Sequence, residues 1–227
     1  MDHHNQSHWI PLSDLMTGLM MIFMLIAVVF MLRVERTTTL VVKEYQETKN
    51  NLYLALQKEF AQNLKQWDAE ILGDMTIRFD DQNVMFDTGS SALKPEFEAM
   101  LDDFIPRYLA LITSPQYKSS VKEIRIEGYA SKKWANSTDE KTAFVDNMRL
   151  SQERAQSTLV YILSNPAIDR YEPWMQDHLT ATGFSSSHPI YQMNNIVDDN
   201  KSQRVEFKII TNADEKMEDI AQRIKEK

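Results

Sequence analysis

Hydrophobic and polar positions divide the chain into an apolar N-terminal run, a long amphipathic stretch and a region that mixes helix and strand patterns. The run between Asp14 and Arg33 contains 18 uncharged residues, of which only Thr17 is overtly polar. An uncharged run of this length is typical of a membrane-spanning helix. We predict a short N-terminal tail over residues 1–11 and a single transmembrane helix over residues 12–32.

The stretch after the apolar run lacks the residues that most often end helices. Neither Gly nor Pro occurs from Leu19 to Leu72. In its second half, apolar residues recur near the helical period at Leu52, Leu56, Phe60, Leu64, Trp67 and Ile71. We predict a helical connector over residues 33–72, with a bend or short strand as the alternative at the β-branched residues 37–42. The apolar stripe suits packing on the chain's own domain and a seam with a second copy equally well.

Residues 73–211 alternate between strand and helix patterns, which predicts one α+β domain. Residues 75–79 and 84–86 read as a hairpin around polar turn residues. The later elements are a helix from Pro95 with Pro106 inside it, a strand ending at Gly128, a helix over residues 147–163, and strands over residues 179–183 and 205–209. This order predicts a two-layer sandwich of sheet and helices. A charged closing helix is predicted over residues 212–227.

Composition excludes several classes of function. The net charge is -8, with 25 Lys and Arg against 33 Asp and Glu, so nucleic acid is not an expected partner. The chain has no Cys, which excludes disulfides and thiolate chemistry. It has no G-x-S-x-G motif, no phosphate loop and no His residues at metal-binding spacing, and His3, His4 and His8 lie in the short tail. We therefore expect no enzyme activity, no metal and no other cofactor.

Asp14 is the first candidate functional residue, because a carboxylate inside a membrane span is costly unless it is paired, neutral or hydrated. Thr17 and Gly18 follow at i+3 and i+4, which puts a hydroxyl and a gap on the same helix face. A neighbouring helix that approached this gap would remove water from the carboxylate. A carboxyl that gains and loses a proton there is an ion carrier. An Asp in the first turn of a helix also caps backbone N–H groups, and this alternative remains open.

Five segments of the C-terminal region resemble, in order and spacing, the OmpA-like peptidoglycan-binding domain. They are residues 86–95, 126–129, 147–155, 182–185 with Pro189, and 203–206, and residues 147–155 are the most specific. The resemblance covers about residues 74–210. It implies that Arg154 and an Asp after the Gly-aromatic strand end hold the diaminopimelate of the wall peptide, through its carboxylate and ammonium groups. The binding residues that it implies are Tyr129, Ser131, Asn147, Leu150, Arg154 and Arg204.

The chain departs from the family pattern near the expected site. Ala130 and Ser131 stand where the family has Thr-Asp, and residues 202–204 read Ser-Gln-Arg where Asn-Arg-Arg is common. The loop from Ser131 to Asp146 is also longer than usual. Asp139 or Asp146 is the candidate replacement for the missing acceptor. The alternatives to wall binding are a surface ion pair for Arg154 and a helix-cap role for Asn147.

The N-terminal run followed by this domain resembles MotB-type stator subunits, and Trp9, Asp14, Leu15, Met16 and Thr17 are the matching positions. Within that group, the short tail, the compact connector and the Asn-Met-Arg-Leu-Ser block resemble the motor subunits of Zorya anti-phage defence systems. The resemblance implies that Asp14 carries the ion. It also implies a homodimer inside a ring of five copies of a multi-span MotA/ZorA-like membrane protein, in contact with membrane lipid and anchored to peptidoglycan.

The orientation signals conflict. Arg33 and Arg36 follow the apolar run while the tail has no Lys or Arg, so the positive-inside rule would put the large domain in the cytoplasm. The resemblance implies the opposite, a single-pass protein of the bacterial inner membrane with a cytoplasmic N-terminus and a periplasmic C-terminal domain. We expect a peptidoglycan-anchored motor subunit that conducts protons, with sodium as the other ion. The alternatives are a flagellar stator subunit and a passive wall anchor.

Overall fold

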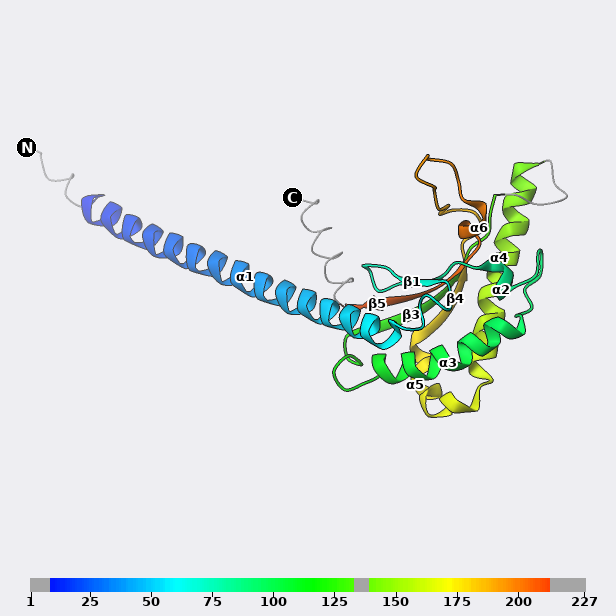
Figure 1. The fold of residues 1–227 in the computed structure, drawn as a ribbon. Coiled ribbons are helices and arrows are strands. Elements are labelled where there is room, and N and C mark those ends of the chain that lie inside the picture. The colour runs from blue at the N-terminus through cyan, green and yellow to red at the C-terminus, as the bar shows by residue number, and fades with distance from the viewer. Residues whose placement is uncertain (1–8, 133–138, 213–227) are drawn as a thin grey trace, which may run out of the picture. The chain divides into compact units, whose positions relative to one another are not determined.

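The computed structural model describes residues 9–132 and 139–212 of a chain that divides into two units, Met1–Glu47 and Thr48–Lys227. The described part of the first unit is helical throughout, because helix α1 begins at Trp9 and ends only at Phe60 (Figure 1). The predicted helix continues through residues 37–42, so the alternative of a short strand there was wrong. Within α1, the 21-residue segment Ser13–Arg33 is long enough, and apolar enough on average, to cross a membrane. A helix therefore lies where the transmembrane segment was predicted.

The second unit contains a five-stranded sheet with the strand order β1-β2-β5-β3-β4 (Figure 1). Neighbouring strands are antiparallel except for β3 and β4, which run parallel. The strands are β1 (Ala69–Ile71), β2 (Ile77–Phe79), β3 (Val121–Gly128), β4 (Leu179–Gly183) and β5 (Val205–Thr211). The helices after α1 are α2 (Gln82–Met85), α3 (Pro95–Ile112), α4 (Glu140–Leu163), the 3-10 helix η1 (Pro166–Tyr171), α5 (Glu172–His178) and α6 (Asp199–Ser202). The predicted α+β sandwich is confirmed.

An aromatic cluster forms the centre of the core between the sheet and α3. Phe104 of α3 lies with its ring centroid 5.2 Å from that of Phe207 on β5 and 5.5 Å from that of Phe79 on β2. The α3 face predicted to point inward is buried along its whole length, at Phe97, Leu101, Phe104, Tyr108 and Ile112. Leu52, Leu56 and Phe60, at the end of α1, are buried in the same core. These three positions therefore pack on the chain's own domain, and the alternative seam with a second copy does not use them.

Two predicted elements at the start of the domain were wrong. The connector helix was expected to reach residue 72, but α1 ends at Phe60 and residues 69–71 form β1. The chain turns back through Asp68, which has a φ of 46°, while Trp67 packs on Phe60 at 5.9 Å. The hairpin partner of β2 is β1 and not residues 84–86, because the Asp81 carboxylate accepts a hydrogen bond from the Asn83 N–H and starts α2. The closing helix expected over residues 212–227 lies outside the described residues beyond Asn212.

Helix α4 begins seven residues earlier than predicted, at Glu140 instead of Asn147. Asp139 caps it, because its side chain accepts hydrogen bonds from the N–H groups of Lys141 and Thr142. Asn147 therefore lies inside the helix, and the interpretation of Asn147 as a helix cap was wrong. The predicted inward face holds, since Leu150, Ala155 and Ile162 are buried and Leu159 packs against the core.

A close approach of α4 to the sheet depends on a glycine at the end of β4. A Cβ added at Gly183 would lie 2.7 Å from the Gln152 Cα and 2.7 Å from the Ser151 Oγ. We expect Gly183→Ala to lower the free energy of unfolding by about 3 kcal/mol, because α4 would have to move away from β4. Urea unfolding in detergent measures this change. Gly73→Ala is the control, since nothing lies within 4 Å of a Cβ there; equal effects of the two substitutions would contradict the prediction.

Candidate functional site

The six candidate wall-binding residues lie just after the end of β3, just before β5, and on the inward face of α4. All six are buried, with relative exposures between 2% and 7%. Four of the six residues contact one another in two pairs. The Asn147 Nδ2 donates a hydrogen bond to the Ser131 carbonyl oxygen at 2.9 Å, and the Arg204 guanidinium lies over the Tyr129 ring at 3.8 Å. Leu150 faces inward on α4 between Asn147 and Arg154.

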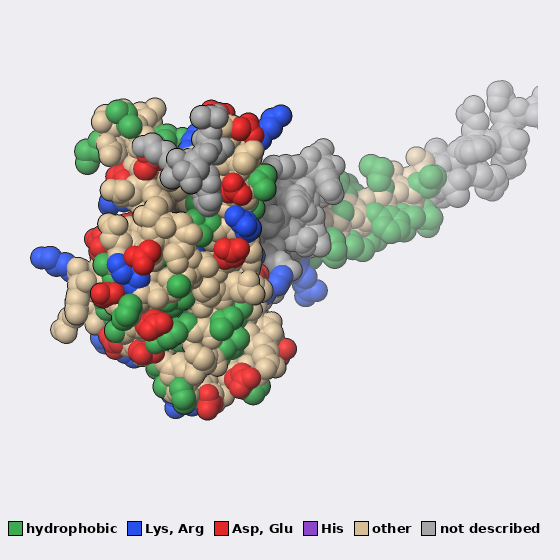
Figure 2. All heavy atoms as spheres, turned by 90° about the vertical axis from the view of Figure 1, so that its right-hand side faces the viewer, with side chains coloured by type: hydrophobic (Ala, Val, Ile, Leu, Met, Phe, Trp, Pro, Cys, Tyr) green, Lys and Arg blue, Asp and Glu red, His purple; other side chains and the backbone are tan. Residues whose placement is uncertain are grey.

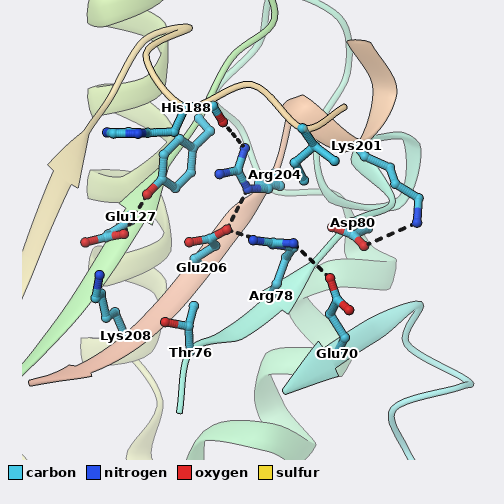
Figure 3. Close-up of polar contacts among 12 residues, drawn as sticks. Glu70, Thr76, Arg78, Asp80, Glu127, His188, Lys201, Arg204, Glu206 and Lys208 are labelled. Carbon is cyan, nitrogen blue, oxygen red and sulfur yellow. Dashed lines mark hydrogen bonds and ion pairs between the residues drawn. The ribbon is translucent and has the colours of Figure 1, made fainter. Parts of the chain in front are cut away.

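Arg204 is neutralised by a neighbouring carboxylate on the polar face of the sheet (Figure 3). Its Nε donates to the Glu206 Oε1 at 2.6 Å, and its Nη1 donates to the His188 carbonyl at 3.2 Å. The same Glu206 oxygen accepts from the Arg78 Nε at 2.7 Å, and Arg78 pairs with Glu70 at 2.8 Å. Through Glu206, this chain of charges links Arg204 at the start of β5 to Arg78 on β2.

Tyr129 is the centre of a small aromatic cluster beside this chain of charges. Its hydroxyl donates to the Glu127 Oε2 at 2.7 Å, and its ring stacks on Phe184 with centroids 5.1 Å apart. The His188 ring lies edge-on to both rings, at 6.2 Å from Tyr129 and 5.7 Å from Phe184. Burial, together with the nearby carboxylates, raises the pKa of Tyr129 above its usual value. The hydroxyl therefore remains a hydrogen-bond donor.

Arg154 is a buried cation whose guanidinium donates hydrogen bonds to backbone carbonyl groups. Its Nε donates to the Ser90 carbonyl at 2.9 Å, its Nη2 donates to the Asp87 carbonyl at 3.3 Å, and its guanidinium lies 4.9 Å from the Phe86 ring centroid. No carboxylate forms an ion pair with it among the described residues, so the alternative of a surface ion pair was wrong. Burial lowers the pKa of Arg154 to about 10, which leaves it charged at neutral pH.

The two candidate replacements for the missing acceptor carboxylate both have partners on α4 itself. Asp139 caps the first turn, and hydrogen bonds from Thr142 hold its pKa below the usual range. Asp146 lies 3.7 Å from the Arg149 guanidinium, one turn further along. Neither contact links these carboxylates to Ser131. Among the described residues, Asn147 donates a hydrogen bond to the Ser131 carbonyl.

The candidate ion-carrying residues lie near the start of the apolar part of α1. Thr17 donates its hydroxyl proton to the Ser13 carbonyl at 2.8 Å, so its oxygen lone pairs remain available as acceptors. Asp14 and the side chains of Ser13–Arg33 are exposed. Gly18 leaves open space beside the helix one turn after Asp14.

Among the described residues, no group of three or more His, Cys, Asp or Glu could hold a metal ion.

Comparison with known proteins gives a relative that matches nearly the whole chain. The chain is 40% identical over 228 residues to the Zorya protein ZorB of an Escherichia coli strain, covering 97% of this chain and 94% of that protein. The chain belongs to the ZorB family. No protein-family model matches this ZorB-family chain.

One of the solved structures compared with this chain shares its fold. The crystal structure of a MotB-like protein from Desulfovibrio vulgaris has a TM-score of 0.51 and 22% identity, covering 76% of this chain and 99% of that one. The periplasmic domain of Helicobacter pylori MotB has a TM-score of 0.43 and 17% identity, covering 65% of this chain and 84% of that one. The likeness of fold rests on the first of these structures.

Sequence reasoning missed the residues that hold the site of this ZorB-family chain together. Glu206 and Arg78 are register partners on β5 and β2, and Glu127 is opposite Glu206 on β3. The signal was the alternation of charged and apolar residues in each strand, with Arg78 on β2 opposite Glu70 on β1 and Glu206 on β5. Acidic and basic side chains are also interspersed over the molecular face in Figure 2, and this face shows no broad basic patch of the kind that binds nucleic acid.

Asp80 at the end of β2 makes stability depend on pH. Its side chain is 8% exposed, its Oδ2 lies 3.9 Å from the Lys201 Nζ, and its Oδ1 has no hydrogen-bond partner among the described residues. Burial raises the pKa of Asp80 from 3.8 to about 6. The folded chain thus binds this proton more tightly than the unfolded chain, so the contribution of Asp80 to stability decreases as pH rises from about 4 to about 6.

We expect Asp80→Asn to raise the melting temperature at pH 7.5 and to change it little at pH 4.5, because Asn resembles the protonated carboxyl. Thermal melting followed by circular dichroism at the two pH values measures this difference. Glu96→Gln, at an exposed position in the first turn of α3, is the control and should show no such pH dependence. A loss of stability in Asp80→Asn at pH 7.5 would show that the charged form is favoured.

Proposed function

We propose that this chain is the peptidoglycan-anchored, proton-conducting motor subunit of an inner-membrane complex that acts in Zorya anti-phage defence. The observation that carries the proposal is its 40% identity to the Zorya protein ZorB over 97% of the chain. A membrane-length apolar helix and a domain with a MotB-like fold in the same chain support it. In this proposal the N-terminus is cytoplasmic, and the second unit lies in the periplasm, where the wall is.

Asp14 is the proposed ion carrier, and Thr17 is its hydroxyl partner on the same helix face. Two copies of the chain would stand inside a ring of a multi-span MotA/ZorA-like protein, with Asp14 facing the ring helices. One elementary charge that crosses 100 mV releases about 2.3 kcal/mol. This energy is enough to change which ring helix packs against the charged or the neutral carboxyl. The open space at Gly18 would let a ring helix come close to the carboxyl.

Arg154 is the proposed anchor for a carboxylate of the wall peptide. A ligand carboxylate would exchange with the carbonyls of Asp87 and Ser90 and would supply the negative charge that Arg154 lacks among its described partners. Asn147 and Leu150 would line the same side of α4, and Asn147 would fix the backbone at Ser131. Tyr129 and Arg204 would hold the strand ends that frame the site.

We expect Arg154→Gln to weaken binding to purified sacculi by about 10- to 100-fold, which corresponds to the loss of one hydrogen bond to a charged group. Cosedimentation of the full chain with sacculi measures the affinity. Arg149→Gln removes an exposed guanidinium from the same helix and is the matched control. Equal affinities of the two variants at unchanged melting temperature would exclude Arg154 as the anchor.

A deletion strain tests the proposed purpose of the complex. We expect deletion of the gene to abolish resistance to phage in plating assays and to leave swimming unchanged. The cloned gene should restore resistance. Loss of swimming with unchanged resistance would instead indicate a flagellar stator subunit.

A further inference from the structure

The loop of residues 188–197 (the 188–197 loop) is an ordered hairpin that leads from β4 to α6. The Asp198 N–H donates to the Ile190 carbonyl at 2.8 Å, and the Gln192 N–H donates to the Ile196 carbonyl at 2.8 Å. The Ile190 N–H donates to the Ser202 hydroxyl at 2.9 Å, which fixes the base of the loop to α6. The loop tip is therefore held in one shape by its own backbone.

The 188–197 loop presents large uncharged side chains to solvent. Tyr191 is 54% exposed and Ile196 is 60% exposed, and Met193 at the tip is fully exposed. The amide side chains of Gln192, Asn194 and Asn195 lie between them and are exposed as well. From Phe184 to Val197 the chain has no Lys, Arg, Asp or Glu, although 26% of all residues are charged. A charged ligand would find no opposite charge on this loop.

The base of the loop is continuous with the proposed wall-binding site. The His188 carbonyl accepts the hydrogen bond from the Arg204 Nη1, so the site residue and the loop share a contact. The exposed His188 ring lies against the half-buried Phe184, which stacks on Tyr129. Aromatic side chains thus run from the site to the loop.

This combination of groups matches a neutral sugar chain. Sugar rings present C–H faces that pack on aromatic and apolar side chains, while N-acetyl and hydroxyl groups exchange hydrogen bonds with amide side chains. We propose that the 188–197 loop binds the neutral N-acetylated amino-sugar strand of peptidoglycan, next to the site for the wall peptide. The inference rests on the proposed function, because it names a second part of the same polymer.

Three wall fractions test the proposal on the full chain in detergent: intact sacculi, glycan strands freed of peptide by an amidase and then amidated at the lactyl carboxyl that the cleavage exposes, and soluble stem peptides. We expect the wild-type chain to bind all three. Tyr191→Ala should weaken binding to the peptide-free glycan at least tenfold and leave binding to stem peptides unchanged. Arg154→Gln should show the reverse pattern. Leu163→Ala, which removes an exposed apolar side chain from the end of α4, is the matched control and should bind like wild type.

Binding of sacculi and stem peptides without binding of peptide-free glycan would overturn this inference and leave the wall anchor standing. If the wild-type chain binds none of the three fractions, the wall anchor is overturned as well. Wild-type glycan affinity in Tyr191→Ala and in a Met193→Ala, Ile196→Ala double variant would also overturn the inference. If those variants changed self-association in light scattering and kept full glycan affinity, the loop would be a protein contact instead.

Discussion

Removing residues 48–60 from the second unit is expected to leave a chain that no longer unfolds cooperatively. Leu52, Leu56 and Phe60 are 0–1% exposed in the core. Burial of each such side chain contributes about 1.5–3 kcal/mol, so their combined loss approaches the whole stability of a domain, about 5–15 kcal/mol. Thermal melting of fragments 48–227 and 61–227 tests this expectation. A fragment 61–227 that melts cooperatively at the same temperature would contradict it.

Of these three residues, we expect Phe60 to contribute most to the free energy of unfolding. Its ring lies 5.2 Å from Phe104 and 5.9 Å from Trp67, and Arg107 covers it at 5.0 Å while donating to the Glu59 carboxylate and carbonyl. Phe60→Ala should therefore cost about 3–5 kcal/mol of unfolding free energy. Leu54→Ala is the control on the same helix, since Leu54 is 52% exposed and its replacement should change stability by less than about 0.5 kcal/mol.

Asp14→Asn is expected to abolish phage protection to the level of a gene deletion, with the protein still present in the membrane. Asn has nearly the shape of Asp and can cap a helix, but it cannot take up and release a proton at physiological pH. The substitution therefore removes the proposed ion transport and retains packing. Immunoblotting of membrane fractions shows whether the variant accumulates, and phage plating shows whether it protects.

Control substitutions separate the motor from a passive anchor. Asp14→Glu retains an ionisable carboxyl and should keep part of the protection, and Thr17→Ser retains the hydroxyl and should keep most of it. A passive wall anchor needs Asp14 only as a helix cap, which Asn also provides. Full protection by Asp14→Asn would therefore support the anchor.

Elements determined by local patterns were predicted well. The strand at residues 179–183 has the predicted boundaries, and the helix from Pro95 begins where predicted and buries the predicted apolar face. The end of α1 was missed because the turn uses Asp68 with a positive φ, without the Gly or Pro that marks most helix ends. The short strand β1 is defined by its pairing with β2, and such a non-local contact leaves little trace in a three-residue sequence.

The resemblance named residues for the candidate site but not their contacts. Resemblance to a known domain pointed to Arg154 and Arg204, while their partners depend on tertiary structure. Glu206 meets Arg204 and Arg78 only because β2 and β5 pair in a particular register. The carbonyls that hold Arg154 come from a loop more than sixty residues away in sequence. Sequence patterns alone determine neither the register of the strand pairing nor the position of the loop that contacts Arg154.

The most direct test of the central claim is proton flux into vesicles that contain this chain together with its multi-span membrane partner. With a potential applied across the vesicle membrane and a pH-sensitive dye inside, the wild-type complex should carry protons. The Asp14→Asn complex, assembled in the same amount, should show no flux above that of empty vesicles. Equal flux through both complexes would contradict the role of Asp14 as the ion carrier.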